Sequence, residues 1–211
     1  MNIIKYVFVA AAMLSATACN GKKSTMEQQG NAGQAATQTD TKQKALVVYF
    51  SHAGDNYSVG VIKVGNTKLI ADYIADITGA DQFELKTKKY DGMAYTPLTE
   101  LAKKEQQRGE LPAFEGSVDV SKYSTIFIGG PVWWGTYPQI MFTFFKQYDL
   151  NGKTLIPFTT HEGSGLGRCV EDVKAAYPKA TVLKGFSIYG HDASNGKPRV
   201  EKWLKGLGFG K

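Results

Sequence analysis

Short apolar runs and amphipathic segments alternate along most of this 211-residue chain. The apolar runs predict buried strands at 45–50, 82–87, 124–130, 154–160 and 181–189. The segments with helical periodicity predict helices at 67–78, 97–107, 138–147, 167–177 and 197–206. Strands of this kind, alternating with amphipathic helices, belong to a parallel sheet that is covered on both faces. The pattern therefore predicts one α/β domain.

Small, hydroxyl and amide residues connect the first predicted strand to the first predicted helix. They come in two groups, Ser51-His52-Ala53-Gly54 and Gly65-Asn66-Thr67. A helix N-terminus offers unpaired N–H groups and the positive end of the helix dipole, so the second group suits a phosphate. Asn66 and Thr67 can equally serve as ordinary N-caps. Residues 55–64 interrupt the loop, which puts residues 54–56 in doubt as phosphate ligands.

Two other strand ends supply a flat apolar wall and a flexible rim. The strand at 124–130 runs into Pro131-Val132-Trp133-Trp134-Gly135, and the strand at 154–160 ends in Thr160-His161-Glu162-Gly163-Ser164-Gly165. Tryptophans at a strand's carboxyl end favour a planar ligand, although core packing is the alternative. Glycines such as Gly163 and Gly165 let backbone approach a ligand edge closely. Which tryptophan would stack, and whether His161 contacts the ring or is only a loop residue, stay open.

The order of these loops resembles the flavodoxin-like family, in particular a branch with an interrupted phosphate loop and a Trp-Trp-Gly-Thr stretch. The resemblance covers residues 44–209. It implies a five-stranded parallel sheet in the order 2-1-3-4-5 with helices on both faces. It also implies FMN, with the phosphate in the interrupted loop and the ring between the tryptophan and His161 loops.

The function implied is electron transfer through non-covalently bound FMN, for which no catalytic side chain is needed. The partner would be a redox protein or a small-molecule electron acceptor. Two other functions stay open: an NAD(P)H-dependent quinone or nitro reductase, and a surface binding module that has lost its cofactor. Other motifs fail, since residues 163–168 lack the last glycine of a dinucleotide fingerprint and no Cys/His cluster has metal spacing.

The first 43 residues differ from the rest in composition. Lys5 precedes an apolar run at 6–14, which is too short to span a bilayer, and the small residues 15–18 lead to Cys19. This segment resembles a bacterial lipobox, which implies a signal peptide at 1–18 and lipidation of Cys19. A plain signal peptide is the alternative. Residues 19–43 then read as a flexible tether and 44–211 as the FMN-binding domain, exported to the cell envelope and anchored to a membrane.

Charge argues against nucleic-acid binding. The whole chain has a formal net charge of +6, and setting aside the five lysines and two acidic residues of positions 1–44 leaves +3. These charges form no arginine-rich stripe. Flavodoxins that hand electrons to basic reductases are typically acidic, so this chain departs from the pattern and implies a different redox partner or small molecules alone. Cys169, on a predicted helix, is expected to be a small buried hydrophobe, and His191 a loop residue.

Overall fold

The computed structural model describes residues 44–209. The predicted signal peptide, the lipidation site Cys19 and the whole predicted tether lie outside the described residues. Within residues 44–209, no helix combines the length and the apolar character needed to cross a membrane.

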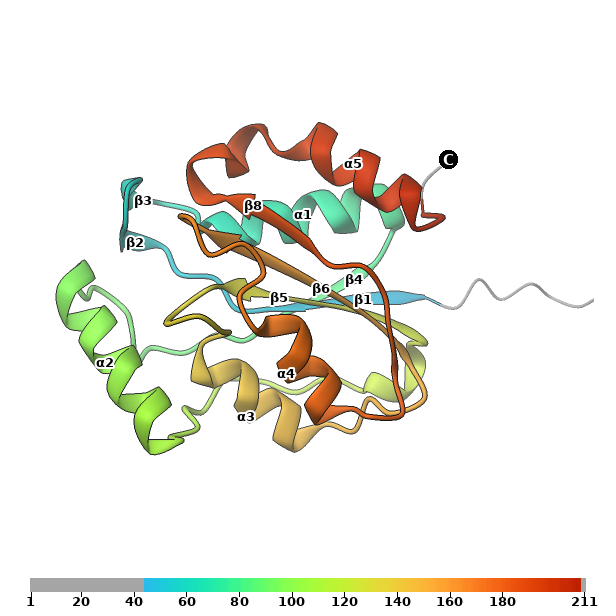
Figure 1. Cartoon of the computed structure of the whole chain (residues 1–211), viewed down its shortest axis with the longest axis horizontal. Coiled ribbons are helices and arrows are strands. Elements are labelled where there is room, and N and C mark those ends of the chain that lie inside the picture. Colours follow the sequence, from blue (N-terminus) through green and yellow to red (C-terminus); the bar gives the residue numbers. More distant parts are fainter. Residues whose placement is uncertain (1–43, 210–211) are drawn as a thin grey trace, which may run out of the picture. The chain divides into compact units, whose positions relative to one another are not determined.

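The centre of the domain is a parallel sheet (Figure 1). Its strands are β1 (Ala45–Tyr49), β4 (Asp81–Glu84), β5 (Thr125–Pro131), β6 (Thr154–His161), β7 (Thr181–Val182) and β8 (Phe186–Tyr189). They lie in the order β4-β1-β5-β6-β7, and β8 also pairs with β6. This confirms the predicted order 2-1-3-4-5. The last predicted strand, 181–189, is divided in two, and the break lies opposite Pro157, which has no N–H to donate to a ladder.

Five helices cover the two faces of the sheet. They are α1 (Asn66–Thr78), α2 (Tyr95–Arg108), α3 (Gln139–Gln147), α4 (Cys169–Ala176) and α5 (Lys197–Gly206). Figure 1 shows α1 and α5 on one side of the sheet, with α3 and α4 on the other. A hydrophobic core lies on each face of the sheet, and β1 contributes side chains to both. Val47 and Tyr49 pack with α1 and α5, whereas Leu46 and Val48 point to the opposite face and pack in the other core.

Two helices begin two residues away from their predicted starts, and the other helix bounds agree with the prediction to within one residue. Helix α2 begins at Tyr95 instead of 97, and α4 begins at Cys169 instead of 167 because the N–H of Gly167 closes a turn onto the Ser164 carbonyl at 3.0 Å. Cys169 is a free cysteine and fully buried, as expected for a small hydrophobe.

The segment that interrupts the phosphate loop folds into a hairpin, which the hydrophobic pattern did not predict. Strands β2 (Gly54–Asn56) and β3 (Gly60–Ile62) pair with each other in an antiparallel sheet separate from the main one. The hairpin is tied to α2, since the N–H of Tyr95 donates to Asp55 Oδ2 at 2.9 Å. Residue Ala94 at the N-cap position provides no side-chain cap, so Asp55 caps this helix from 40 residues away.

Candidate functional site

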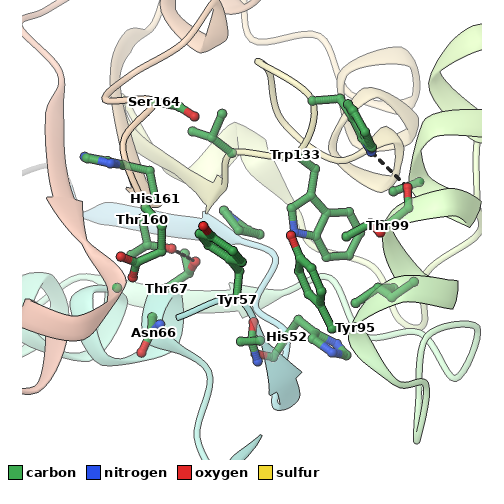
Figure 2. Close-up of a pocket in the computed structure, with 18 of the residues that line it drawn as sticks. His52, Tyr57, Asn66, Thr67, Tyr95, Thr99, Trp133, Thr160, His161 and Ser164 are labelled. Atoms are coloured by element: carbon green, nitrogen blue, oxygen red, sulfur yellow. Dashed lines mark hydrogen bonds between the residues drawn. The ribbon is translucent and has the colours of Figure 1, made fainter. Parts of the chain in front are cut away.

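A cavity of about 320 Å³ opens at the carboxyl ends of β1, β5 and β6. Its size lies within the range of small-molecule sites, and its position is where open parallel sheets bind ligands. Nine residues predicted from the sequence line it: His52, Asn66, Thr67, Pro131, Val132, Trp133, Trp134, Thr160 and His161. Six other predicted residues do not: Ser51, Ala53, Gly65, Gly135, Gly163 and Gly165. Figure 2 shows the main lining side chains.

One end of the cavity is polar and lies at the start of α1. The hydroxyls of Thr67 and Thr160 are 2.7 Å apart and both residues are buried. Asn66 and Thr67 are also the first two residues of the helix, so their N–H groups have no acceptor within it. This end can donate several hydrogen bonds to an anion, as the sequence predicted for a phosphate.

Two predicted phosphate-loop residues support this polar end from behind. Ser51 Oγ accepts the N–H of Lys68 at 3.0 Å and so caps α1. Gly65 is buried against the same hydroxyl, and a Cβ there would lie 2.6 Å from the carbonyl oxygen of His52 and closer still to Ser51 Oγ. The glycine therefore allows a close approach of two backbone segments. The third predicted loop residue, Ala53, is exposed to solvent and does not line the cavity.

The tryptophan loop turns sharply, so its two indoles have different surroundings. The N–H of Trp133 donates to the carbonyl of Thr136 at 2.8 Å, and the φ angles of Trp134 and Gly135 are 52° and 84°. Two consecutive positive φ angles are typical of a type I′ turn and explain the glycine.

Both tryptophans line the cavity, but Trp134 is bonded to α2 whereas Trp133 packs against aromatic side chains of the core. The indole N–H of Trp134 donates to the Thr99 carbonyl at 2.9 Å, and Lys103 Nζ lies 4.7 Å from its ring centroid, a cation–π distance. Trp133 packs edge-on against Phe50 and Tyr90, with ring centroids 5.5 Å apart in both pairs. Of the two tryptophans, Trp133 is therefore the rigidly packed wall (Figure 2).

His161 lies at the end of β6 with its ring position fixed. The N–H of Gly163 donates to His161 Nδ1 at 2.9 Å, so the neutral ring carries its proton on Nε2. Burial lowers the pKa of His161, which keeps the ring neutral near pH 7. The ring packs beside Tyr189, with centroids 4.6 Å apart.

Glu162 and Gly190 belong to the cavity, although the sequence did not point to them. The carboxylate of Glu162 accepts a hydrogen bond from the backbone N–H of His191 at 3.0 Å, and its other oxygen lies 2.7 Å from His191 Nδ1. His191, expected to be a loop residue, therefore holds the side chain of a cavity residue in place. A Cβ at Gly190 would lie 2.5 Å from Asn66 Nδ2 and 2.8 Å from Glu162 Oε1. The contact between Gly190 and Asn66 joins segments more than 100 residues apart, and those of Glu162 with Gly190 and His191 join two different loops, so no local sequence signal reveals them.

The other end of the cavity is aromatic and apolar, and it too was not predicted. Tyr57 from the hairpin and Tyr95, Leu98 and Ala102 from α2 line it. The last three share one helical face by their spacing, but nothing in the sequence indicates that this face meets the cavity. Asp55 and Asn56 also lie here, and Asn56 Nδ2 donates to the Gly54 carbonyl at 3.0 Å, which stabilises the hairpin.

His52 lies on the cavity wall as a buried side chain, and its Nε2 has no hydrogen-bond partner among the described residues. Burial lowers the pKa of His52 from its ordinary value of 6.5, while the charges of Asp91 and Asp55 oppose this shift. The folded protein therefore binds this proton less readily than the unfolded chain does.

We expect His52 to make the protein less stable in mild acid. Its contribution is complete above pH 6.5 and is lost as the pH falls from 6.5 towards the lower folded-state pKa. Urea unfolding of the wild type and of His52→Gln between about pH 7.5 and pH 5 measures this. The variant should lose less stability over that interval, and parallel pH profiles for the two proteins would contradict the expectation.

Fold and site together define a flavodoxin-like α/β protein with a cavity that combines an anion-binding end and aromatic walls. The Flavodoxin family model matches residues 44–207, so the chain belongs to the flavodoxin family. None of the curated proteins compared with the chain matches it.

Solved structures agree with this family. A protein from Bacteroides uniformis described as a flavoprotein is 29% identical, with a TM-score of 0.63, over 77% of this chain and 97% of that one. A similarly described protein from Bacteroides eggerthii is 25% identical, with a TM-score of 0.59, over 77% and 96%. A flavoprotein from Lactobacillus acidophilus, solved in complex with FMN, shares the fold at 22% identity and a TM-score of 0.55, over 76% and 98%.

Proposed function

We propose that this protein binds FMN non-covalently and transfers electrons through it. The observation that carries the proposal is the cavity at the sheet's carboxyl edge, whose polar end and aromatic wall match the two ends of a phosphorylated planar cofactor. Family membership and a flavodoxin-like relative solved with FMN support it.

The residues present fit FMN by their chemistry. Thr67, Thr160 and the first N–H groups of α1 would hold the phosphate, because they offer donors beside the positive end of the helix dipole. Trp133 would support the ring with an apolar face. Ser164 and the Nε2–H of His161 would supply polar contacts at the rim.

When bound, FMN supplies the redox chemistry, and the protein supplies binding, orientation and exclusion of water. Trp133 stays fixed during turnover because its ring is packed edge-on by Phe50 and Tyr90. The Thr67–Thr160 pair anchors the ligand at the opposite end. A rigid site of this kind keeps the cofactor in one orientation towards its electron partner.

Anaerobic stopped-flow mixing of the FMN-loaded protein with NADH or NADPH tests the electron-transfer proposal. We expect slow bleaching of the flavin absorption band that does not saturate with the nicotinamide, because a carrier is reduced by a protein donor. Rapid, saturable bleaching would favour the NAD(P)H-dependent quinone or nitro reductase instead. The partner of a carrier remains a redox protein or a small-molecule acceptor, and the net charge of +3 beyond residue 44 favours an acidic one.

The proposed place of action is the envelope of a bacterial cell, with the domain tethered through a lipid on Cys19. Cys19→Ser should prevent incorporation of a labelled fatty acid and release the protein into the soluble fraction, because the tether has no other apolar anchor. An unlabelled wild-type chain, or a variant that stays in the membrane fraction, would contradict the lipoprotein proposal.

A further inference from the structure

The hairpin inserted in the phosphate loop brings an aromatic side chain to the cavity. Tyr57 lies at its turn and lines the cavity, although 61% of its surface is exposed. In Figure 2 its ring lies between the Thr67 side of the cavity and Trp133. A large aromatic side chain that borders a cavity while remaining open to solvent is typical of a ligand contact.

The hairpin is held in this position by α2. Asp55 accepts the N–H of Tyr95 at 2.9 Å, and the Tyr57 and Tyr95 rings lie 5.7 Å apart with an interplanar angle of 31°. The hairpin strands begin at Gly54 and Gly60, whose φ angles are +103° and +70°. Such positive φ angles favour glycine, and both glycines pair within the hairpin, Gly54 with Ile62 and Gly60 with Asn56.

The other rings around the cavity are already engaged elsewhere. Trp134 is bonded to α2 through Thr99, and His161 packs on Tyr189 and accepts the N–H of Gly163. Trp133 forms one wall. Among the described residues, Tyr57 is thus the large aromatic ring that lines the cavity with most of its surface free to cover a ligand.

We propose that the hairpin β2–β3 is a second wall of the ring site, in which Tyr57 covers a planar ring system supported by Trp133 and Asp55 fastens the hairpin to α2. This inference rests on the proposed function, because the planar ring is that of FMN. This second wall would give a role to the insertion in the phosphate loop. The hairpin must move away from the ring before FMN can dissociate, and an electron partner can approach the ring only at the edge that Tyr57 leaves uncovered.

Flavin dissociation from the whole chain measures this role. In stopped-flow displacement, Tyr57→Ala should raise the dissociation rate about tenfold, as expected for the loss of one aromatic contact and its buried area. Riboflavin should be affected by the same factor as FMN, because the cover acts on the ring and not on the phosphate. Tyr57→Phe should restore wild-type rates, and Asp55→Ala should raise the rate by a smaller factor, since it loosens the hairpin but keeps the ring.

Val61→Ala is the matched control, because Val61 lies on the same hairpin, is 81% exposed and does not line the cavity. Its rates should equal those of the wild type. Unchanged dissociation from Tyr57→Ala, while the wild type binds FMN, would overturn the second wall and leave the proposed function intact. A wild type that binds neither flavin would overturn both. Circular dichroism of each variant shows that the exposed substitutions leave the fold unchanged.

Discussion

Replacing Gly65 with alanine should lower the free energy of unfolding by about 1–3 kcal/mol and remove measurable FMN binding. The added Cβ would lie 2.6 Å from the His52 carbonyl oxygen and would overlap Ser51 Oγ, which caps α1. Relief of this overlap requires the start of α1 to shift away from the end of β1. That shift carries the N–H groups of Asn66 and Thr67 out of the phosphate-binding end.

Urea unfolding and flavin titration of Gly65→Ala measure both effects. Gly206→Ala is the control, because a Cβ at that position meets nothing within 4 Å and alanine is favoured over glycine in a helix. It should be as stable as the wild type or slightly more so, with unchanged FMN binding. A Gly65→Ala protein with wild-type stability and wild-type affinity would show that the two segments do not need this close approach.

Removing one hydroxyl from the polar end of the cavity should weaken the binding of FMN but not that of riboflavin. Thr67→Val keeps the side-chain shape but loses the oxygen that lies 2.7 Å from Thr160 Oγ1. We expect FMN affinity to fall by about 1–3 kcal/mol, roughly a 5- to 150-fold rise in Kd, because hydrogen bonds to a charged group are strong. Riboflavin, which has no phosphate, should bind as before.

Thr78→Val provides the comparison at the other end of α1, where the Thr78 hydroxyl donates to the Ile74 carbonyl at 2.7 Å and accepts the N–H of Ala80 at 3.2 Å. Thr78 does not line the cavity. The variant should leave both flavins unaffected. Equal weakening of FMN and riboflavin by Thr67→Val would place the phosphate elsewhere. Ser51→Ala should act mainly on stability, by about 1 kcal/mol, because the structure shows Ser51 as a helix cap behind the cavity.

The sheet and its helices were predictable because their signals are local. Continuous apolar strands and amphipathic helices indicated a parallel sheet covered on both faces, and the resemblance to the flavodoxin-like family supplied the strand order. The hairpin at residues 54–62 has strands of three residues each, too short for a periodic pattern. The break between β7 and β8 depends on Pro157 in a neighbouring strand, which no pattern within 181–189 can reveal.

The residues of the site also fall into those that the sequence could predict and those that it could not. Trp133 and Thr160, at or just after strand ends, and Thr67, at the start of the helix that follows β1, could be found because the carboxyl ends of parallel strands meet at one edge. Tyr57 and Gly190 reach the cavity only through tertiary packing of an insertion and of a distant 3₁₀ helix. The sequence left open which tryptophan would stack on a ring, because no local signal reveals how the type I′ turn separates their surroundings. Both indoles line the cavity, but only Trp134 is bonded to α2.

The visible spectrum of the purified protein shows whether the chain binds FMN. The whole chain, titrated with FMN and freed of excess, should be yellow and should release one FMN per chain when it is denatured, because the cofactor is held without a covalent bond. A folded but colourless protein, whose FMN titration shows no saturable binding, would show that the cavity does not bind FMN.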